Sequence, residues 1–128
     1  MNTENILVPF DRNSSDLKGL YHAFSLAERI RAKVFVLFFT DDISGHSSET
    51  PLQKACLEMV HSACEEGKSV SFHLAGTPPE TELRSIIKTE HIDLIVIDAG
   101  DTRMKSVIRD INAGLSIQIL EVKGKYHY

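Results

Sequence analysis

The sequence predicts an α/β domain in which a mostly parallel sheet carries helices on both faces. Short apolar runs alternate with stretches of helical periodicity along 128 residues, without internal repeats or a linker. Such alternation is typical of parallel sheets built from β-α-β units. The longest apolar run, Val34 to Phe39, suits a strand covered on both faces. With 42% hydrophobic and 25% charged residues, the chain has the composition of a single globular domain, residues 1–128.

The first third of the chain predicts a strand, a helix and a strand. Ile6 to Phe10 is a short apolar run, in which Pro9 lacks an N–H and is expected near the end of the strand. Val34 to Phe39 forms the second strand. The helix between them has N-cap candidates at Asn13, Ser14 and Ser15. Its apolar face follows helical spacing at Leu17, Leu20, Tyr21, Phe24, Ala27 and Ile30.

The rest of the chain continues the same alternation. A helix is expected to open at Thr50, with Pro51 in its first turn, and to end at Gly67. Val70, Phe72 and Leu74 then alternate with polar residues, which predicts a shorter strand near an edge. A capping box at Thr77 and Glu80 opens a third helix with a buried stripe at Leu83, Ile86 and Ile87. The last elements are a strand at 94–97, a helix at 103–113 and a strand at 117–122.

Charge and targeting signals narrow the possible partners. The net charge of −4 argues against nucleic acid, because phosphate binding usually shows a basic patch. No apolar run is long enough for membrane insertion, and the N-terminus has no secretory signal. We therefore expect a cytoplasmic protein.

The two cysteines fit a reducing compartment. Cys56 and Cys64 are eight residues apart on a predicted helix, about 12 Å along its axis, which is too far for a disulfide. Cys56, Val60 and Cys64 have the spacing of a buried stripe. The alternative is a metal pair formed by His61 and Cys64, although the sequence has no zinc-ligand spacing.

Acidic residues follow several predicted strands and would gather at the carboxyl edge of the sheet, together with Gly76. The five are Asp11, Asp41, Asp42, Asp98 and Asp101. Carboxylates are the ligands that Mg²⁺ and Ca²⁺ prefer. The alternative is that these loop carboxylates are merely solvated. Neither cysteine lies at this edge and no histidine follows a strand in a catalytic setting, so we expect no enzyme. A phospho-accepting receiver is also disfavoured, because the third strand ends in Ala75-Gly76.

Three segments together resemble the universal stress protein family. Ile6 to Asp41 resembles its opening unit, with a first strand ending in V-P-x-D. Gly76 to Ile97 is similar to its G-x-P, helix and D-L-I-V-I stretch, and Ser106 to Val122 to its closing helix and strand. The resemblance covers nearly the whole chain. It implies a three-layer α/β/α sandwich with a five-stranded parallel sheet of order 3-2-1-4-5, as in adenine nucleotide alpha hydrolase-like folds.

The resemblance also implies where a nucleotide would bind. Asp11 would face the adenine amino group, and Phe39 would line the base pocket. The alternative for Asp11 is a cap of the first helix, and the alternative for Phe39 is packing in the core. Gly76 belongs to the matching G-x-P, and Gly100 and Ser106 fall in the phosphate-binding stretch, where Gly100 alone also suits a simple turn.

The phosphate-binding stretch departs from the family pattern. Nucleotide-binding members carry G-x2-G-x9-G-[ST] after the fourth strand. Here Asp98 and Asp101 occupy the places of the first two glycines, and about six residues are missing before Ser106. A carboxylate about 4 Å from a phosphate oxygen costs about 4 kcal/mol at an effective dielectric near 20. We therefore expect no cofactor.

These features lead to two functional hypotheses. The first is a non-catalytic stress-response regulator that does not bind ATP tightly and acts through an unknown protein partner. The second is an adenine-nucleotide module in which Asp98 and Asp101 hold Mg²⁺ for ATP or AMP.

The last strand predicts a homodimer. It lies at an edge in the implied order and has only one charge, so it is open to pairing with a second copy. The residues expected at the interface are Ile117, Ile119, Leu120 and Val122.

Overall fold

The computed structural model describes residues 4–11, 17–39, 51–76, 79–112 and 117–122. Strands and helices alternate through these residues, as predicted. The strands are β1 (Asn5–Phe10), β2 (Lys33–Phe39), β3 (Val70–Ala75), β4 (Leu94–Asp98) and β5 (Gln118–Val122). The helices are α1 (Lys18–Ile30), α2 (Pro51–Glu65), α3 (Pro79–Thr89) and α4 (Thr102–Ile111).

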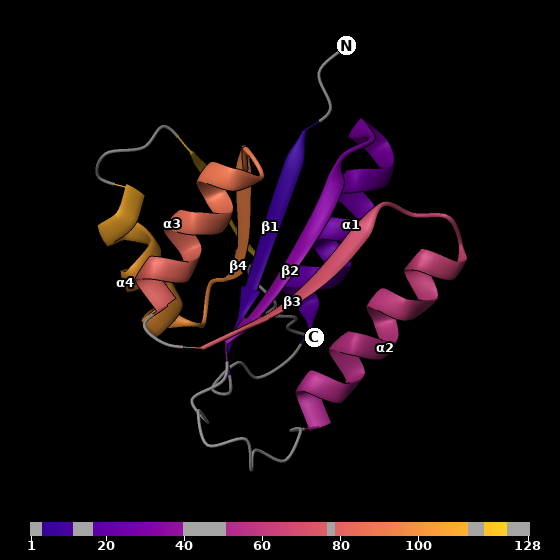
Figure 1. Cartoon of the computed structure of the whole chain (residues 1–128), viewed down its shortest axis with the longest axis horizontal. Helices are drawn as coiled ribbons and strands as arrows, with labels where there is room; N and C mark the ends of the chain where they lie inside the picture. Colours follow the sequence, from indigo (N-terminus) through magenta and orange to yellow (C-terminus); the bar gives the residue numbers. More distant parts are fainter. Residues whose placement is uncertain (1–3, 12–16, 40–50, 77–78, 113–116, 123–128) are drawn as a thin grey trace, which may run out of the picture.

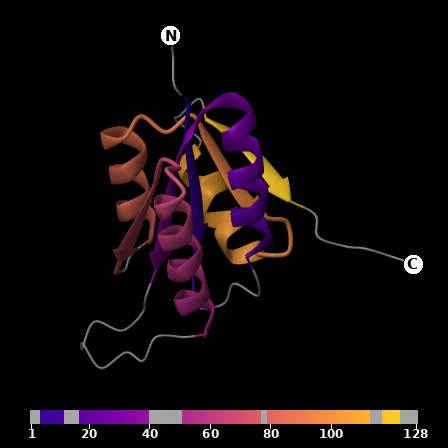
Figure 2. The ribbon, with the colours of Figure 1, turned by 90° about the vertical axis from the view of Figure 1, so that its right-hand side faces the viewer.

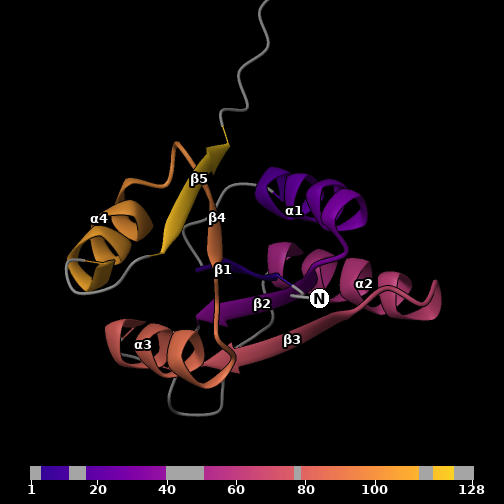
Figure 3. The same cartoon turned by 90° about the horizontal axis from the view of Figure 1, so that it is seen from above.

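The strands form one parallel sheet in the order β3-β2-β1-β4-β5, which confirms the predicted fold class. Helices α1 and α2 cover one face and α3 and α4 the other (Figures 1 and 3). β3 and β5 are the two edge strands, at opposite ends of the sheet (Figure 2).

The core has one apolar cluster on each face of the sheet. Val36 and Val96 lie on the α1–α2 face, and Leu37 and Ile95 lie on the α3–α4 face. Their relative exposures are 0%, 0%, 3% and 1%, as expected for the apolar runs 34–39 and 94–97 that mark the second and fourth strands.

The sheet consists of two regular parts joined by a short seam. β1 and β2 are in register over six residue pairs, as are β2 and β3, while β4 and β5 form five pairs. β1 and β4 share only two, Ile6 with Leu94 and Leu7 with Ile95. We call these two pairs the seam. In Figure 3, β4 and β5 run at a steep angle to β1, β2 and β3.

Pro9 explains why the seam ends at Leu7. The Lys33 amide of β2 donates to the Glu4 carbonyl, and the Asp93 amide, just before β4, donates to the Asn5 carbonyl. Because successive residues of a strand direct their backbone groups to opposite sides, the odd-numbered residues of β1 face β4. The next donor toward β4 after Leu7 would be residue 9, and proline has no N–H. Pro9 therefore ends the β1–β4 ladder at Leu7 and leaves the ladder between β1 and β2 intact.

Asn5 closes the opposite end of the seam. Its side-chain Nδ2 donates to the Glu90 carbonyl at 2.8 Å and the His91 carbonyl at 3.2 Å. Its backbone amide donates to Asp93 Oδ2 at 2.9 Å. His91 has a φ of 53°, in the left-handed region where a helix commonly ends. One side chain therefore ties the start of β1 to the turn between α3 and β4.

Two side chains of α1 were wrongly predicted to be buried. Tyr21 is 64% and Ile30 40% exposed. The face toward the sheet instead uses small residues, Gly19, Ala23 and Ala27, beside Leu20. A Cβ at Gly19 would lie 3.9 Å from Val8 Cγ1, an ordinary van der Waals contact, so this face of the helix packs directly on β1.

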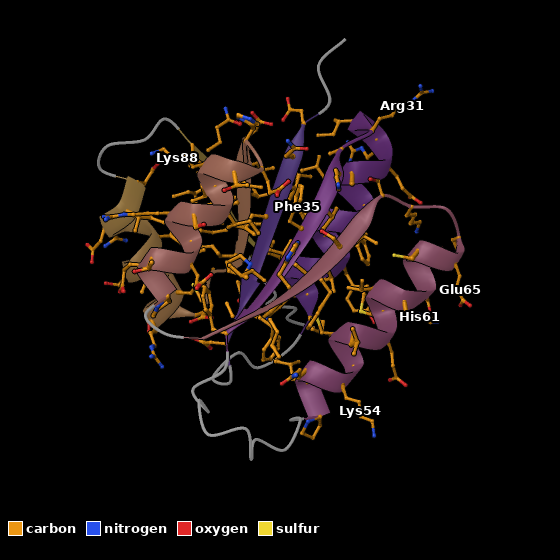
Figure 4. All side chains as sticks on the ribbon, viewed as in Figure 1. Arg31, Phe35, Lys54, His61, Glu65 and Lys88 are labelled. Carbon is orange, nitrogen blue, oxygen red and sulfur yellow. The ribbon has the colours of Figure 1, made fainter. Side chains whose placement is uncertain are left out.

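The cysteine stripe was also partly wrong. Cys56 is buried, which raises the pKa of its thiol to about 12, but Cys64 is exposed and its Sγ donates to the Val70 carbonyl at 3.4 Å. The buried stripe of α2 is Cys56, Val60 and Ala63. His61 lies on the outer side of α2 (Figure 4), with its Nε2 3.8 Å from Glu65 Oε2. Its neighbour is thus Glu65, and not Cys64 as a metal pair would require.

Several boundaries differ slightly from the prediction. α1 begins at Lys18 after Leu17, which gives no side-chain cap, and α4 spans Thr102–Ile111 rather than 103–113. β3 is an edge strand as predicted but has six residues, one more than β4. The cap candidates at 13–15 and Thr77 lie outside the described residues.

Candidate functional site

The candidate site lies where the strand order reverses, at the carboxyl ends of β1 and β4. In open parallel sheets, ligands commonly bind beyond the strands at this switch point. Asp11 follows β1 there and Asp98 ends β4. Asp41 and Asp42, the other members of the predicted acidic group, lie outside the described residues. The described part of the chain contains no group of three or more His, Cys, Asp or Glu residues placed to hold a metal ion.

Asp11 is the buried carboxylate of this region, with a relative exposure of 7%. Among the described residues it is the only polar or charged one in the buried class. It takes part in an interaction within the protein. Its backbone position directly after the central strand holds the carboxylate at the carboxyl end of the sheet.

Phe39 ends β2 and is 3% exposed. Its side chain belongs to the apolar cluster on the α3–α4 face, with Leu37 and Ile97. The structure therefore places Phe39 in the core, where it supports the end of the strand.

The turn from β4 to α4 uses its backbone amides internally. The Gly100 amide donates to Asp98 Oδ1 at 2.9 Å, and the Met104 amide donates to Asp101 Oδ1 at 3.1 Å. The Asp101 amide donates to the Asp98 carbonyl at 2.9 Å. Asp101 is the N-cap of α4, a position where a carboxylate satisfies the first free amides of a helix. Two carboxylates thus occupy amides of the kind that bind phosphate in other folds.

The ends of this turn are also held. The Ala99 amide donates to the Val122 carbonyl of β5 at 3.0 Å, and the Thr102 amide donates to the Gly100 carbonyl at 3.1 Å. Lys105 Nζ lies 3.5 Å from the Ala99 carbonyl and 3.1 Å from Glu121 Oε1. The turn is consequently tied to both α4 and β5.

A cation that the sequence did not point to lies beside Asp98. Lys18 Nζ, at the start of α1, is 3.5 Å from Asp98 Oδ2. The two side chains are 30% and 17% exposed, so the pair is only partly screened by water. Asp98 therefore faces α1, while Asp101 faces the first turn of α4.

The glycines and Ser106 have no special geometry. A Cβ at Gly76 would meet nothing within 4 Å, and one at Gly100 would lie 3.5 Å from Asp98 Oδ1, an ordinary contact. Of the described glycines, only Gly67 has a positive φ. Ser106 is exposed in the second turn of α4, past the amides at the start of the helix.

Two cavities lined by described residues lie away from the switch point. One of about 280 Å³ is at the amino end of the sheet, lined by Phe24, Val34 and Val70 with Arg31 and Lys68. The other, of about 270 Å³, lies between α4 and β5 and includes Lys105 and Glu121. Of the predicted site residues, Ile119 of the expected dimer interface lines the second cavity, and none of the predicted nucleotide or metal residues lines either one.

The sequence model of the universal stress protein family matches residues 2–109 of this chain. The chain belongs to the universal stress protein family. No curated protein matches the sequence. No helix among the described residues is long and apolar enough to cross a membrane.

Solved structures of this family share the fold. One from Archaeoglobus fulgidus is 20% identical to this chain, with a TM-score of 0.66. The match covers 96% of this chain and 100% of the Archaeoglobus chain. A universal stress protein in complex with cAMP is 15% identical, with a TM-score of 0.59 and coverages of 93% and 96%. A family protein from Arabidopsis thaliana with AMP bound is 10% identical, with a TM-score of 0.57 and coverages of 95% and 92%.

Proposed function

We propose that this universal stress protein is a cytoplasmic, non-catalytic regulator that does not bind nucleotide phosphates tightly and acts through a protein partner. The observation that carries this proposal is the β4–α4 turn, where Asp98 and Asp101 accept hydrogen bonds from the Gly100 and Met104 amides. An incoming phosphate needs such amides free. It would have to displace two carboxylates of its own charge.

Lys18 reduces the repulsion that a phosphate would meet but does not free the amides. Its ammonium group offsets the charge of Asp98. The hydrogen bonds of Gly100 and Met104 are unaffected by that pairing. The contacts to an adenine base are less altered, because Asp11 keeps its place after β1. We therefore expect adenosine to bind no worse than ATP.

A non-catalytic role is supported by the described serine and histidine residues. Ser71 Oγ and His73 Nε2 are 3.1 Å apart on β3, but this pair is on an edge strand and partly or fully exposed. No hydrogen bond from a third described residue orients His73. The pair lacks the orienting group that a serine nucleophile and its base normally require.

Titration calorimetry tests the proposal. ATP without divalent cation should bind no more tightly than about 100 μM, equivalent to about −5.5 kcal/mol. Adenosine should bind at least as well under the same conditions. Binding of metal-free ATP at low micromolar Kd would overturn the proposal.

The second candidate function is an adenine-nucleotide module assisted by Mg²⁺. It is favoured by the family structures with bound cAMP and AMP. Asp98 and Asp101 would hold the metal, which requires Asp98 to leave Gly100 and Lys18. Low micromolar ATP binding only with Mg²⁺, abolished in Asp98→Asn with Asp101→Asn, would establish this function instead. Asparagine preserves the size and the acceptor oxygen of each side chain.

The proposal includes a homodimer through β5. Among the described strands, β5 pairs with β4 only. Ile119, Leu120 and Val122 in the strand, and Ile117 just before it, are partly buried. The Gln118 amide donates to Asp93 and the Val122 carbonyl accepts from Ala99, so even-numbered residues face β4. The backbone groups of Ile119 and Glu121 therefore face outward, where a second copy would pair.

Glu121→Pro tests the dimer because it removes an outward donor without touching the β4–β5 ladder. Glu121→Ala is the matched control, since it also loses the contact with Lys105 but keeps the N–H. Light scattering should give about 28 kDa for the wild type and the alanine variant and about 14 kDa for the proline variant, from a chain of 14.3 kDa. A monomeric wild type at micromolar concentration would contradict the dimer.

A further inference from the structure

The outer edge of β3 is uncovered in the described part of the chain. β3 pairs with β2 alone, and the Val34 amide donates to the Ser69 carbonyl at 3.0 Å. This bond sets the alternation, so residues 71, 73 and 75 face β2 and the backbone groups of Val70, Phe72 and Leu74 face outward. Figure 3 shows no helix on the outer side of β3. The edge therefore presents donors and acceptors to which another strand can pair.

This edge lacks the usual protection against pairing. Its sequence, Val-Ser-Phe-His-Leu-Ala, contains no Lys, Arg, Asp, Glu, Pro or Gly. The ladder with β2 runs through six consecutive pairs without a bulge. Leu74 is 55% exposed beside the half-buried Phe72 on the same face. Charged residues, prolines and bulges are the devices by which edges normally avoid association.

We propose that β3 is a second self-association site, at which it pairs antiparallel with β3 of a second copy about a two-fold axis at Phe72. Phe72 would then lie opposite Phe72 of the second copy, and Val70 opposite Leu74. All three residues have outward backbone groups, so each pair exchanges an N–H and a C=O. The Val70 carbonyl can accept such a bond beside that from Cys64, since it has two lone pairs.

The side chains of this pairing are complementary on both faces. The α2 face brings together Val, Phe and Leu, and aromatic and branched cross-strand pairs stabilise a sheet. The other face places Ser71 opposite His73, two residues already within 3.1 Å of each other along the strand. His73 stacks on Phe35 at 6.2 Å, and Phe35 lies on the part of the sheet beside α3 (Figure 4). The chemical pattern of β3 is thus nearly palindromic about Phe72.

A second copy is the occupant that these features favour. No like charges meet across the axis, and the outward N–H and C=O groups of each copy pair with those of the other. β5 is less complementary to itself, because a two-fold axis at Leu120 sets Glu121 opposite Ile119. The β3 contact is independent of the β5 dimer. Use of both edges would extend the sheet through successive copies.

A register-specific disulfide tests this proposal. Two single variants, Ser71→Cys and His73→Cys, are made in a Cys64→Ser background and mixed under mild oxidation. Residues opposite each other in a non-hydrogen-bonded pair have Cα atoms about 4.5 Å apart, within disulfide range. The mixture should give a covalent dimer on a denaturing gel, whereas each variant alone gives none, because like positions lie about 8 Å apart. A gel read this way does not respond to association through β5.

Two further variants provide the control for association. Leu74→Lys places a charge on the β3 edge at an exposed position, and Tyr21→Lys places one at an exposed position on α1. The first, introduced into both cysteine partners, should reduce cross-linking by about tenfold or more, equivalent to about 1.4 kcal/mol. The second should leave it unchanged, and circular dichroism should show both folded. No cross-link in the mixture, or an equal cross-link in either single variant, would overturn the proposal.

Discussion

The two parts of the sheet on either side of the seam are built differently. The β1–β2–β3 part has strands of six or seven residues and full ladders. The β4–β5 part has strands of five residues and meets the first part through two residue pairs. The difference shows how a parallel sheet can keep a continuous core while its carboxyl end separates at the switch point. Among the described residues, the strand pairing between the parts lies at the amino end.

Among substitutions that test the difference between the two parts, we expect the largest loss of stability at Ile95, which lies in the seam and is 1% exposed. Ile95→Ala should lower the free energy of unfolding by about 2–5 kcal/mol, because it removes buried methyl groups and leaves a cavity. A urea melt measures the loss. Leu37→Ala, in the wider part, is the matched control and should cost a similar amount. A loss below about 1 kcal/mol for Ile95→Ala would mean that the seam contributes little.

Asn5 should have the next largest effect. Asn5→Ala removes the side-chain bonds to Glu90 and His91 and leaves two carbonyls without these donors. We expect a loss of about 1–3 kcal/mol in the free energy of unfolding. Glu4→Ala, at the adjacent exposed position, should change it by less than about 0.5 kcal/mol. Equal effects for the two variants would show that the seam does not depend on the Asn5 side chain.

Asp101 tests the narrower part of the sheet. Asp101→Ala removes the cap at the Met104 amide and should cost about 1 kcal/mol. Asp110→Ala makes the same substitution in the last turn of α4. That carboxylate is exposed and faces the negative end of the helix dipole, so its removal should be neutral or slightly stabilising. Thermal melts measure both changes. If Asp110→Ala were the more destabilising variant, the N-cap at Asp101 would not be what stabilises the start of α4.

Pro9 should have the smallest effect on stability and the most local one. Pro9→Ala supplies the donor that β1 lacks toward β4, a gain of about 0.5–1.5 kcal/mol. The substitution also raises the conformational entropy of the unfolded chain, which lowers the free energy of unfolding by about 0.4–1 kcal/mol. The net change should stay within about 1 kcal/mol, while hydrogen exchange should show a protected amide at residue 9. An unprotected amide there would show that proline is not what ends the seam.

The fold was predictable because its signals are local. Apolar runs such as 34–39 and 94–97 mark buried strands, and their alternation with helices gives the parallel sheet. Periodicity was less reliable for helix faces. It favoured Tyr21 and Ile30 because they are apolar, whereas the buried face of α1 also includes the small residues Gly19 and Ala23, which carry little hydrophobic signal.

The candidate site was only partly predictable. Asp98 and Asp101 stand out because they replace glycines of a family pattern, but the sequence does not show that they accept from Gly100 and Met104. Lys18 carried no signal at all. It reaches Asp98 because α1 packs against β4 as well as β1, which brings together two residues that are eighty positions apart in the sequence.

The position of Asn5 has a consequence for the order in which the nascent chain can fold. Its bonding partners lie 85 to 88 positions later, so they leave the ribosome long after β1. β1 and β2 can pair with α1 over them as soon as residue 39 emerges, but the apolar flank of β1 that awaits β4 stays open until the Leu94–Asp98 strand has been made. Contacts at such separation slow folding and expose strand edges in the meantime. The interval between the emergence of residue 39 and that of residue 98 is therefore the stage at which this protein most needs protection from aggregation.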